Sequence, residues 1–163
     1  MASAATPAIK ALQAAGISYE IRQFRHDPRA TSFGDEAVTE LAAEGFVAAQ
    51  IFKTLVLAIP GGLAVAVLPV PDKLSFKAAA AALGVPKAEM AEQAAAQRAT
   101  GYVVGGISPL GQRKSLPTVV DKSALGWDRV LCSAGKRGLD IVLAPADLVI
   151  ATSAVTAEIC TPR

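Results

Sequence analysis

The sequence has few of the residues that build metal, redox or disulfide sites. Its two cysteines, Cys132 and Cys160, form no CxxC pair and have no histidine near them in the chain. This composition predicts neither a zinc site nor a disulfide framework. We therefore expect two ordinary buried thiols, no metal and no cofactor.

Long apolar runs are also missing. No run approaches the roughly 18 residues that a membrane span needs, and the first residues, MASAATPAIK, lack the basic stretch and apolar core of a secretory signal. We therefore expect a cytoplasmic protein that does not enter a membrane. The 163 residues and the 52% hydrophobic content instead fit one globular domain, residues 1–163, with a proper core.

The chain lacks the strong positive charge of proteins that bind nucleic acid mainly by charge. Its 16 basic and 14 acidic residues leave a net charge of +2. The basic residues are nevertheless grouped, and they would form a local positive patch if their loops met in space; otherwise they are solvated loop charges. The three groups are Arg22, Arg25 and Arg29; Arg113 and Lys114; and Lys136 and Arg137.

Capping residues and apolar patterning predict the secondary structure. We expect helices over residues 7–15 and 33–45, two Ala-rich helices within 73–98 divided at Gly84 to Pro86, and a last helix from Pro145. We expect strands over residues 17–24, 51–59, 63–70, 102–104, 116–121, 128–134 and 139–144. Hairpins should form across residues 60–62 and across GKRG. Helices distributed among hairpins predict an α+β domain on a mixed or largely antiparallel sheet.

Lys53 is out of place in its surroundings. It lies in the run IFKTLVLAI, which is apolar enough to form a strand that is covered on both faces. Lysine is almost never fully buried without a partner. The residue must therefore lie at a sheet edge, extend its amine to water, or line a functional cleft. Thr54 should face the opposite side of a regular strand.

The segment GYVVGGISPLGQRKSLPTVVD, residues 101–121, contains an incomplete phosphate-binding loop. Gly101 and Gly106 have the GxxxxG spacing, but Ile107 occupies the position of the required lysine. Gly105 and Gly106 could instead present backbone N–H groups to an oxyanion, with Pro109 stiffening the exit. A bulge and a turn remain the alternative.

Two other polar groups have simple structural interpretations. His26, in the tripeptide His26-Asp27-Pro28, could act as a base, but no nucleophile is placed for it and a turn is the favoured interpretation. The pair Asp35 and Glu36 is interpreted first as acidic residues that complement a helix N-terminus, with a carboxylate site as the alternative.

Five blocks resemble, in order, those of the YbaK/EbsC family, the bacterial Cys-tRNA(Pro) deacylases related to the editing domain of prolyl-tRNA synthetase. The blocks are TPAIKAL, RHDPRATSFGDEAV, FKTLVLAI, AQRATGYVVGGISPLGQRKSLPTVVD and SAGKRGLDIVLA. The resemblance runs from about Thr6 to beyond Leu143. It implies a stand-alone editing enzyme with a mixed, partly open β-barrel-like sheet surrounded by helices, and prolyl-tRNA synthetase as its partner.

The resemblance also implies a set of site residues. Lys53 is expected to be the essential polar residue beside Thr54, and the loop from Gly105 to Pro109 is expected to hold the tRNA 3′ end and the ester carbonyl. Phe24 stands where the family commonly has Tyr, so a role for that hydroxyl is not expected. The predicted catalytic residues are Lys53, Gly105 and Gly106. The predicted substrate-binding residues are Phe24, Phe33, Thr54, Ile107, Ser108, Pro109, Ser133 and Asp140. The predicted tRNA contacts are Arg113, Lys114, Lys136 and Arg137.

The reaction implied by the resemblance needs no protein nucleophile, because the thiol of the substrate cysteine attacks its own ester to form a thiolactone. Two alternatives stay open: deacylation of another mischarged tRNA such as Ala-tRNA(Pro) by water, and a non-catalytic module that binds a tRNA end or a synthetase. Since the protein is weakly basic, we expect selection of the proline tRNA to come from association with the synthetase.

Overall fold

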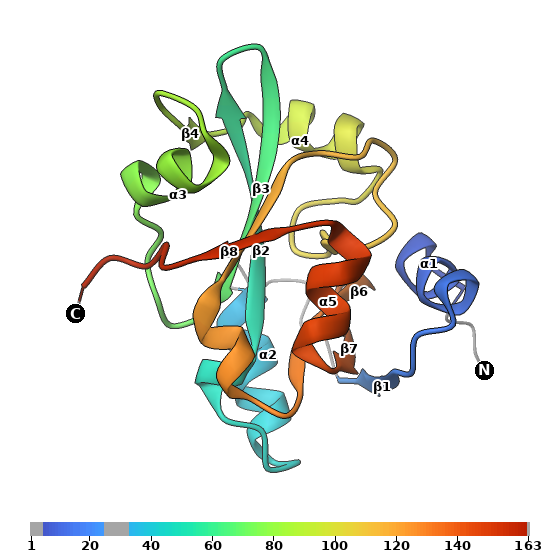
Figure 1. The fold of residues 1–163 in the computed structure, drawn as a ribbon. Helices are drawn as coiled ribbons and strands as arrows, with labels where there is room; N and C mark the ends of the chain where they lie inside the picture. The colour runs from blue at the N-terminus through green and yellow to red at the C-terminus, as the bar shows by residue number, and fades with distance from the viewer. Residues whose placement is uncertain (1–4, 25–32, 163) are drawn as a thin grey trace.

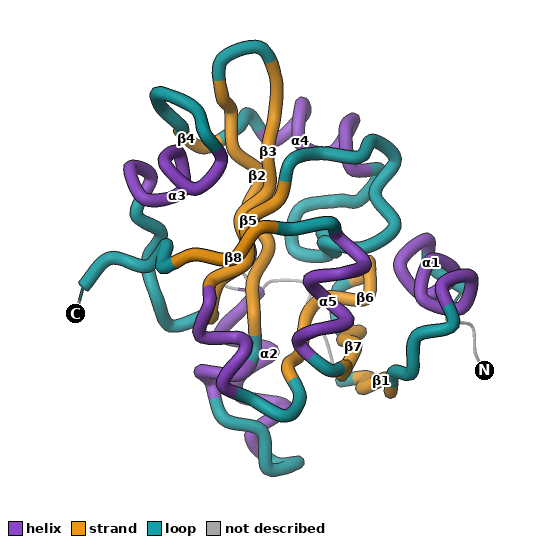
Figure 2. The backbone as a smooth tube through the Cα atoms, viewed as in Figure 1, coloured by secondary structure: helices purple, strands orange, loops and turns teal. Residues whose placement is uncertain are grey.

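The computed structural model describes residues 5–24 and 33–162, with the side chains of residues 33 and 34 excepted. The described helices are α1 (Pro7–Ala15), α2 (Phe33–Ala42), α3 (Phe76–Leu83), α4 (Gln93–Thr100) and α5 (Pro145–Thr152), with 3-10 turns η1 (Ala48–Gln50) and η2 (Lys122–Gly126) (Figure 1). The described strands are β1 (Glu20–Gln23), β2 (Phe52–Ile59), β3 (Gly62–Pro69), β4 (Glu89–Met90), β5 (Thr118–Asp121), β6 (Val130–Lys136), β7 (Leu139–Leu143) and β8 (Val155–Ala157) (Figure 2).

The described strands form two sheets that do not close into a barrel. One sheet has the order β4-β2-β3-β5-β8 and mixes antiparallel and parallel pairs, and the other has the antiparallel order β1-β7-β6. A parallel bridge between Ile51 and Leu131 joins them, just before β2 and within β6. The predicted α+β class with a mixed, partly open sheet is confirmed.

The β2–β3 hairpin forms the centre of the larger sheet because both of its faces are apolar. Phe52, Val65 and Val67 pack on one face with residues from α1 and α5. Leu57 and Leu68 pack on the other face, where α3 covers them (Figure 1). The turn at Gly61, with φ of 84°, connects the two strands as the residues 60–62 predict.

The predicted caps fix the ends of the helices. Thr6 accepts a hydrogen bond from the N–H of Ile9 at 3.3 Å and donates to the carbonyl of Ala134 at 2.6 Å, so it ties the start of α1 to β6. Gly16 and Gly84, with φ of 70° and 73°, end α1 and α3 in the left-handed conformation that glycine favours.

The prediction of a strand at residues 102–104 is wrong. Tyr102 is buried and its hydroxyl donates to the carbonyl of Leu110 at 2.6 Å, while the N–H of Val104 donates to the side chain of Gln97 at 3.0 Å. Backbone and side-chain bonds within the loop therefore replace the ladder of a sheet. Gly101, with φ of 82°, ends α4 directly before this segment.

Two short strands, β4 and β8, are absent from the prediction. Residues 89 and 90 pair with Leu57 and Ala58, so the second Ala-rich helix begins at Gln93 and not directly after the break at Pro86. Strand β8 pairs in parallel with β5 at the edge of the sheet. Among the described helices, none has the length and apolar character that a bilayer crossing requires.

Candidate active site

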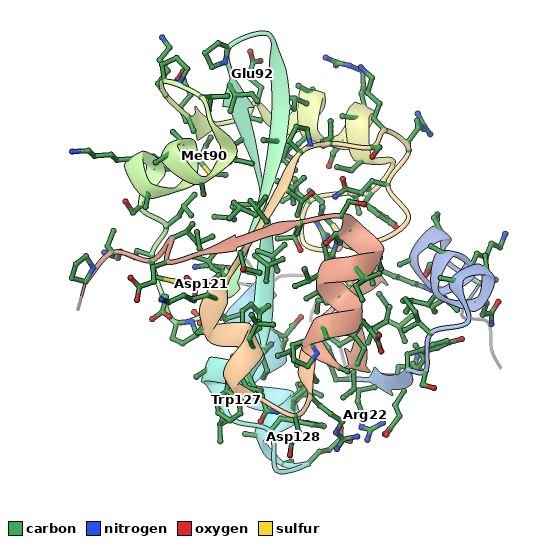
Figure 3. The ribbon with its side chains drawn as sticks, in the orientation of Figure 1. Arg22, Met90, Glu92, Asp121, Trp127 and Asp128 are labelled. Carbon is green, nitrogen blue, oxygen red and sulfur yellow. The ribbon has the colours of Figure 1, made fainter. Side chains whose placement is uncertain are left out.

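A cavity of about 430 Å³ opens where the two sheets separate. Beyond the bridge between Ile51 and Leu131, β2 forms one wall and the β6–β7 hairpin forms the other. The loop before β5 and residues of α2, β4 and α4 complete the lining. Met90 of β4 belongs to this lining, and Figure 3 shows it at the opposite end of the molecule from Arg22 and Asp128. The predicted site residues that line the cavity are Phe24, Lys53, Thr54, Gly105, Ile107, Ser133, Lys136, Arg137 and Asp140.

Lys53 reaches from β2 to the chain that follows β3. Its ammonium donates to the carbonyls of Val70 at 3.1 Å and Asp72 at 2.6 Å. Burial lowers the pKa of Lys53, and the nearby Asp72 carboxylate opposes that shift. An ammonium has three donors, and the described residues accept from two of them. The third N–H is left for a molecule in the cavity that Lys53 lines.

Thr54, the next residue, presents the opposite face of β2. Its Oγ1 is buried, and among the described residues no group forms a hydrogen bond with it. Buried hydroxyls are almost always bonded. A polar ligand in the cavity, which Thr54 lines, could therefore form the hydrogen bond that this hydroxyl lacks among the described residues.

The glycine-rich loop presents different donors from those predicted. The N–H of Gly106 donates to the carbonyl of Val103 at 2.9 Å, so the prediction of a free donor at Gly106 is corrected. In the part of the chain that the structure describes, the N–H groups of Gly105 and Ile107 have no acceptor. These two residues line the cavity and form the candidate oxyanion pair.

Gly106 serves to bring the loop against the β6–β7 turn. A Cβ at this position would lie 3.0 Å from the backbone nitrogen of Arg137 and 3.1 Å from the Cα of Lys136. Ser108 is buried behind the loop, where its hydroxyl accepts a hydrogen bond from the N–H of Leu110 at 3.2 Å. Pro109 is buried too. Gly106, which was predicted to be catalytic, and Ser108 and Pro109, which were predicted to bind substrate, thus lie in the loop but outside the cavity lining.

Arg137 is a tether of this loop. Its guanidinium donates to the carbonyl of Val104 through Nε at 3.0 Å and Nη2 at 2.6 Å. The predicted tRNA contact at Arg137 is therefore bonded within the chain, whereas Lys136 is exposed at the cavity. Arg113 and Lys114 are exposed beside the end of α4, outside the lining.

Phe33, the first basic group and the FGDE block remain to be placed. Phe33 begins α2, but its side chain lies outside the described residues, as do Arg25, His26 and Arg29. Arg22 forms ion pairs with Glu20 at 2.7 Å and Glu44 at 3.0 Å. Glu36 of the FGDE block lines the cavity, although the favoured interpretation of its sequence was a helix N-terminus and not a carboxylate site.

Asp140 and Ser133 face each other across β7 and β6. Asp140 is 6% exposed, and burial raises the pKa of its carboxyl to about 7. Ser133 accepts a hydrogen bond from the N–H of Gly135 at 3.1 Å, which leaves its own hydroxyl proton to donate. The two side chains give the β6–β7 wall of the cavity a polar surface.

The arrangement can hold a small polar molecule and stabilise negative charge on it. Lys53 and the N–H groups of Gly105 and Ile107 supply donors, and Asp140 supplies an acceptor. Among the described residues, no group of three or more His, Cys, Asp or Glu side chains is placed to hold a metal ion.

Comparison with known proteins places these features in a wider group. Residues 34–150 match the family of aminoacyl-tRNA editing domains. The chain is 39% identical over 130 residues to EbsC of Enterococcus faecalis, assigned as a Cys-tRNA(Pro)/Cys-tRNA(Cys) deacylase; the match covers 78% of this chain and 79% of EbsC.

One further relative and one solved structure of similar fold extend the comparison. The chain is 32% identical over 142 residues to the proline–tRNA ligase of Shouchella clausii, a match that covers 87% of this chain and 24% of the ligase. The fold resembles that of a crystal structure assigned as a trans-editing enzyme for prolyl-tRNA synthetase, with a TM-score of 0.85, 23% identity and 99% of each chain covered.

Proposed function

The chain belongs to the aminoacyl-tRNA editing domain family, and we propose that it is a deacylase that removes cysteine from mischarged Cys-tRNA(Pro). The observation that carries this proposal is the cavity in which an anchored lysine, Lys53, shares the lining with Gly105 and Ile107, whose N–H groups have no acceptor among the described residues. Such a site suits an ester carbonyl whose oxygen gains negative charge during cleavage. The 39% identity with EbsC supports the choice of substrate.

We propose that the substrate cysteine supplies the nucleophile. Its sulfur attacks the ester carbonyl, a C–S bond forms, the C–O bond to the terminal ribose breaks, and the thiol proton passes to the departing ribose oxygen. The products are a cyclic thiolactone and free tRNA. The enzyme then contributes orientation and charge stabilisation, which can each supply several kcal/mol.

The protein's own thiols are poor candidates for that nucleophile. Burial raises the pKa of the Cys132 thiol, and burial followed by the nearby Asp121 and Asp72 carboxylates raises that of Cys160 to about 12. Both thiols are therefore protonated at neutral pH, and a thiol is a weak nucleophile compared with a thiolate. This supports a reaction in which the substrate brings the sulfur.

The test compares release of tRNA from Cys-tRNA(Pro), Ala-tRNA(Pro) and S-methylcysteinyl-tRNA(Pro). We expect the cysteinyl ester to be preferred, the S-methylated ester to resist, and Lys53→Ala to lower kcat/KM for the cysteinyl ester by about 10²- to 10³-fold, as removal of one charge-stabilising donor does. Lys87→Ala is the control, because Lys87 is exposed and lies outside the cavity lining. Equal cleavage of all three esters, or full activity of Lys53→Ala, would refute the proposal.

We further propose that prolyl-tRNA synthetase supplies the choice of tRNA. The net charge of +2 is too small to select one tRNA strongly by charge alone. The proposed tRNA contacts are Arg113, Lys114 and Lys136, because the guanidinium of Arg137 is bonded to the carbonyl of Val104. Discrimination between Cys-tRNA(Pro) and Cys-tRNA(Cys) should appear when the synthetase is added. Equal discrimination without the synthetase would contradict this assignment.

A further inference from the structure

Asp140 is a buried carboxylate in the wall of the cavity, and no described residue is its partner. Its side chain is 6% exposed, and within the described residues it forms no hydrogen bond and no ion pair. Buried polar groups are bonded in the great majority of cases, and a buried charge without a partner is costly. The missing partner should therefore come from a molecule that enters the cavity.

The charged groups around the cavity do not supply that partner. Arg22, the neighbour of Asp140 across β1 and β7, is paired with Glu20 and Glu44. Lys53 donates to two backbone carbonyls, and Arg137 donates to a third. The other charged residues of the lining are Glu36, which has the wrong sign, and Lys136, which is exposed and makes no bond to Asp140.

Resting on the proposed function, we propose that Asp140 binds the α-ammonium group of the aminoacyl ester, and that the enzyme thereby selects esters with a free amino group over N-acylated ones. An aminoacyl ester carries a primary ammonium two bonds from the carbonyl carbon, whereas the end of a peptidyl-tRNA carries a neutral amide. The ammonium offers the charge and the donors that Asp140 lacks. The 430 Å³ of the cavity is in the range of small-molecule sites.

Proton release accompanies this binding. Burial raises the pKa of Asp140 to about 7, so part of the population is protonated at neutral pH before a ligand binds. A bound ammonium favours the ionised carboxylate. Binding of a free-amine ligand at pH 7 should therefore release protons, and binding of its N-acetylated form should release none from Asp140.

The experiment uses 3′-deoxy-3′-(cysteinylamino)adenosine and its N-acetyl derivative, in which an amide replaces the cleavable ester. Binding is measured by calorimetry at pH 7 in two buffers of different ionisation enthalpy, for the wild-type protein, Asp140→Asn and Asp128→Asn. Asp128 is the matched control because it is an exposed carboxylate outside the cavity lining, ahead of β6 (Figure 3).

We expect the wild-type protein and Asp128→Asn to bind the free-amine probe about 10- to 100-fold more tightly than the N-acetyl probe, the range for a hydrogen bond to a charged group. Asp140→Asn should bind the two probes equally and release no protons. A wild-type protein that fails to bind the free-amine probe or to prefer it, or an Asp140→Asn protein that keeps the preference, would overturn the inference. Because the probes need no turnover, failure of the wild-type protein to cleave Cys-tRNA(Pro) would refute the proposed function separately.

Discussion

Replacement of Asp140 by Asn should make the protein more stable at alkaline pH and less dependent on pH. The Asp140 carboxyl is 6% exposed and lines the cavity, and no described residue is its partner. Its ionised form is therefore poorly solvated in the folded protein and well solvated in the unfolded chain. This difference ties the folding equilibrium to the proton on Asp140.

The sign follows from the two pKa values. The pKa of Asp140 is raised from its ordinary 3.8 to about 7 in the folded protein, so between these values the folded state holds a proton that the unfolded state has released. The contribution of Asp140 to the free energy of unfolding is fully present below about pH 4. It falls as the pH rises from about 4 and is lost once the pH has passed about 7. The difference of about three pH units, at about 1.4 kcal/mol each, corresponds to about 4 kcal/mol.

The measured gain should be smaller than that figure at alkaline pH. A buried Asn amide without partners costs about 1–3 kcal/mol itself, so we expect Asp140→Asn to exceed the wild-type free energy of unfolding by about 1–3 kcal/mol at pH 8. At pH 4, where Asp140 is protonated in the wild-type protein, the advantage should vanish or reverse.

Urea unfolding followed by circular dichroism at each pH from 4 to 8 gives the free energies, and Asp128→Asn serves as the control for loss of a carboxylate. The informative quantity is the difference between variant and wild type, because other carboxyl groups titrate in both. A difference that stays constant from pH 4 to pH 8 would refute the reasoning, as would a wild-type protein that is the more stable at pH 8.

Three further predictions concern the loop that borders the cavity. Gly106→Ala places a Cβ 3.0 Å from the Arg137 backbone nitrogen, so it should displace the loop and cost about 1–3 kcal/mol, measured by urea unfolding; unchanged stability and activity would contradict the contact. Arg137→Lys loses the two-pronged bond to the Val104 carbonyl and should lower kcat for Cys-tRNA(Pro) by about tenfold while affinity for tRNA changes little; the reverse pattern would identify Arg137 as a tRNA contact. Tyr102→Phe leaves the buried carbonyl of Leu110 without its donor and should lower the melting temperature by an amount equivalent to about 1–3 kcal/mol, whereas an unchanged melting temperature would show that water replaces the hydroxyl.

Most of the fold was predictable because its signals are local. Caps such as Thr6 and Gly16 mark the ends of α1 whatever the rest of the chain does. The apolar runs around residues 60–62 likewise specify a hairpin from their own pattern. The segment around Tyr102 has the composition of a strand, but its bonds run to Gln97 and Leu110, which composition cannot indicate. Strands β4 and β8 are short and exist only through pairing with β2 and β5.

The candidate site also has features that one segment of sequence predicts and features that depend on contacts between segments. Lys53 was predictable because a charge inside an apolar run conflicts with burial, and that conflict is visible in one segment. The donors of the glycine-rich loop are predicted at Gly105 and Gly106, whereas among the described residues the N–H of Ile107 has no acceptor and that of Gly106 has one. Which N–H lacks an acceptor among the described residues depends on a turn to Val103, and the role of Arg137 depends on contact between two loops far apart in the chain. Neither is encoded in residue type alone.

Lys53 and Asp140 are both charges in apolar strands, yet the structure treats them differently. Lys53 is anchored to the carbonyls of Val70 and Asp72, so its substitution removes a contact of the fold as well as a charge of the site. Asp140 has no such anchor among the described residues, so its substitution should relieve the fold and harm binding. A variant that gains stability while it loses ligand affinity indicates a group kept for the ligand. Opposite signs for Asp140→Asn in unfolding and in probe binding would therefore identify a ligand-binding carboxylate, and a loss of both would identify a structural one.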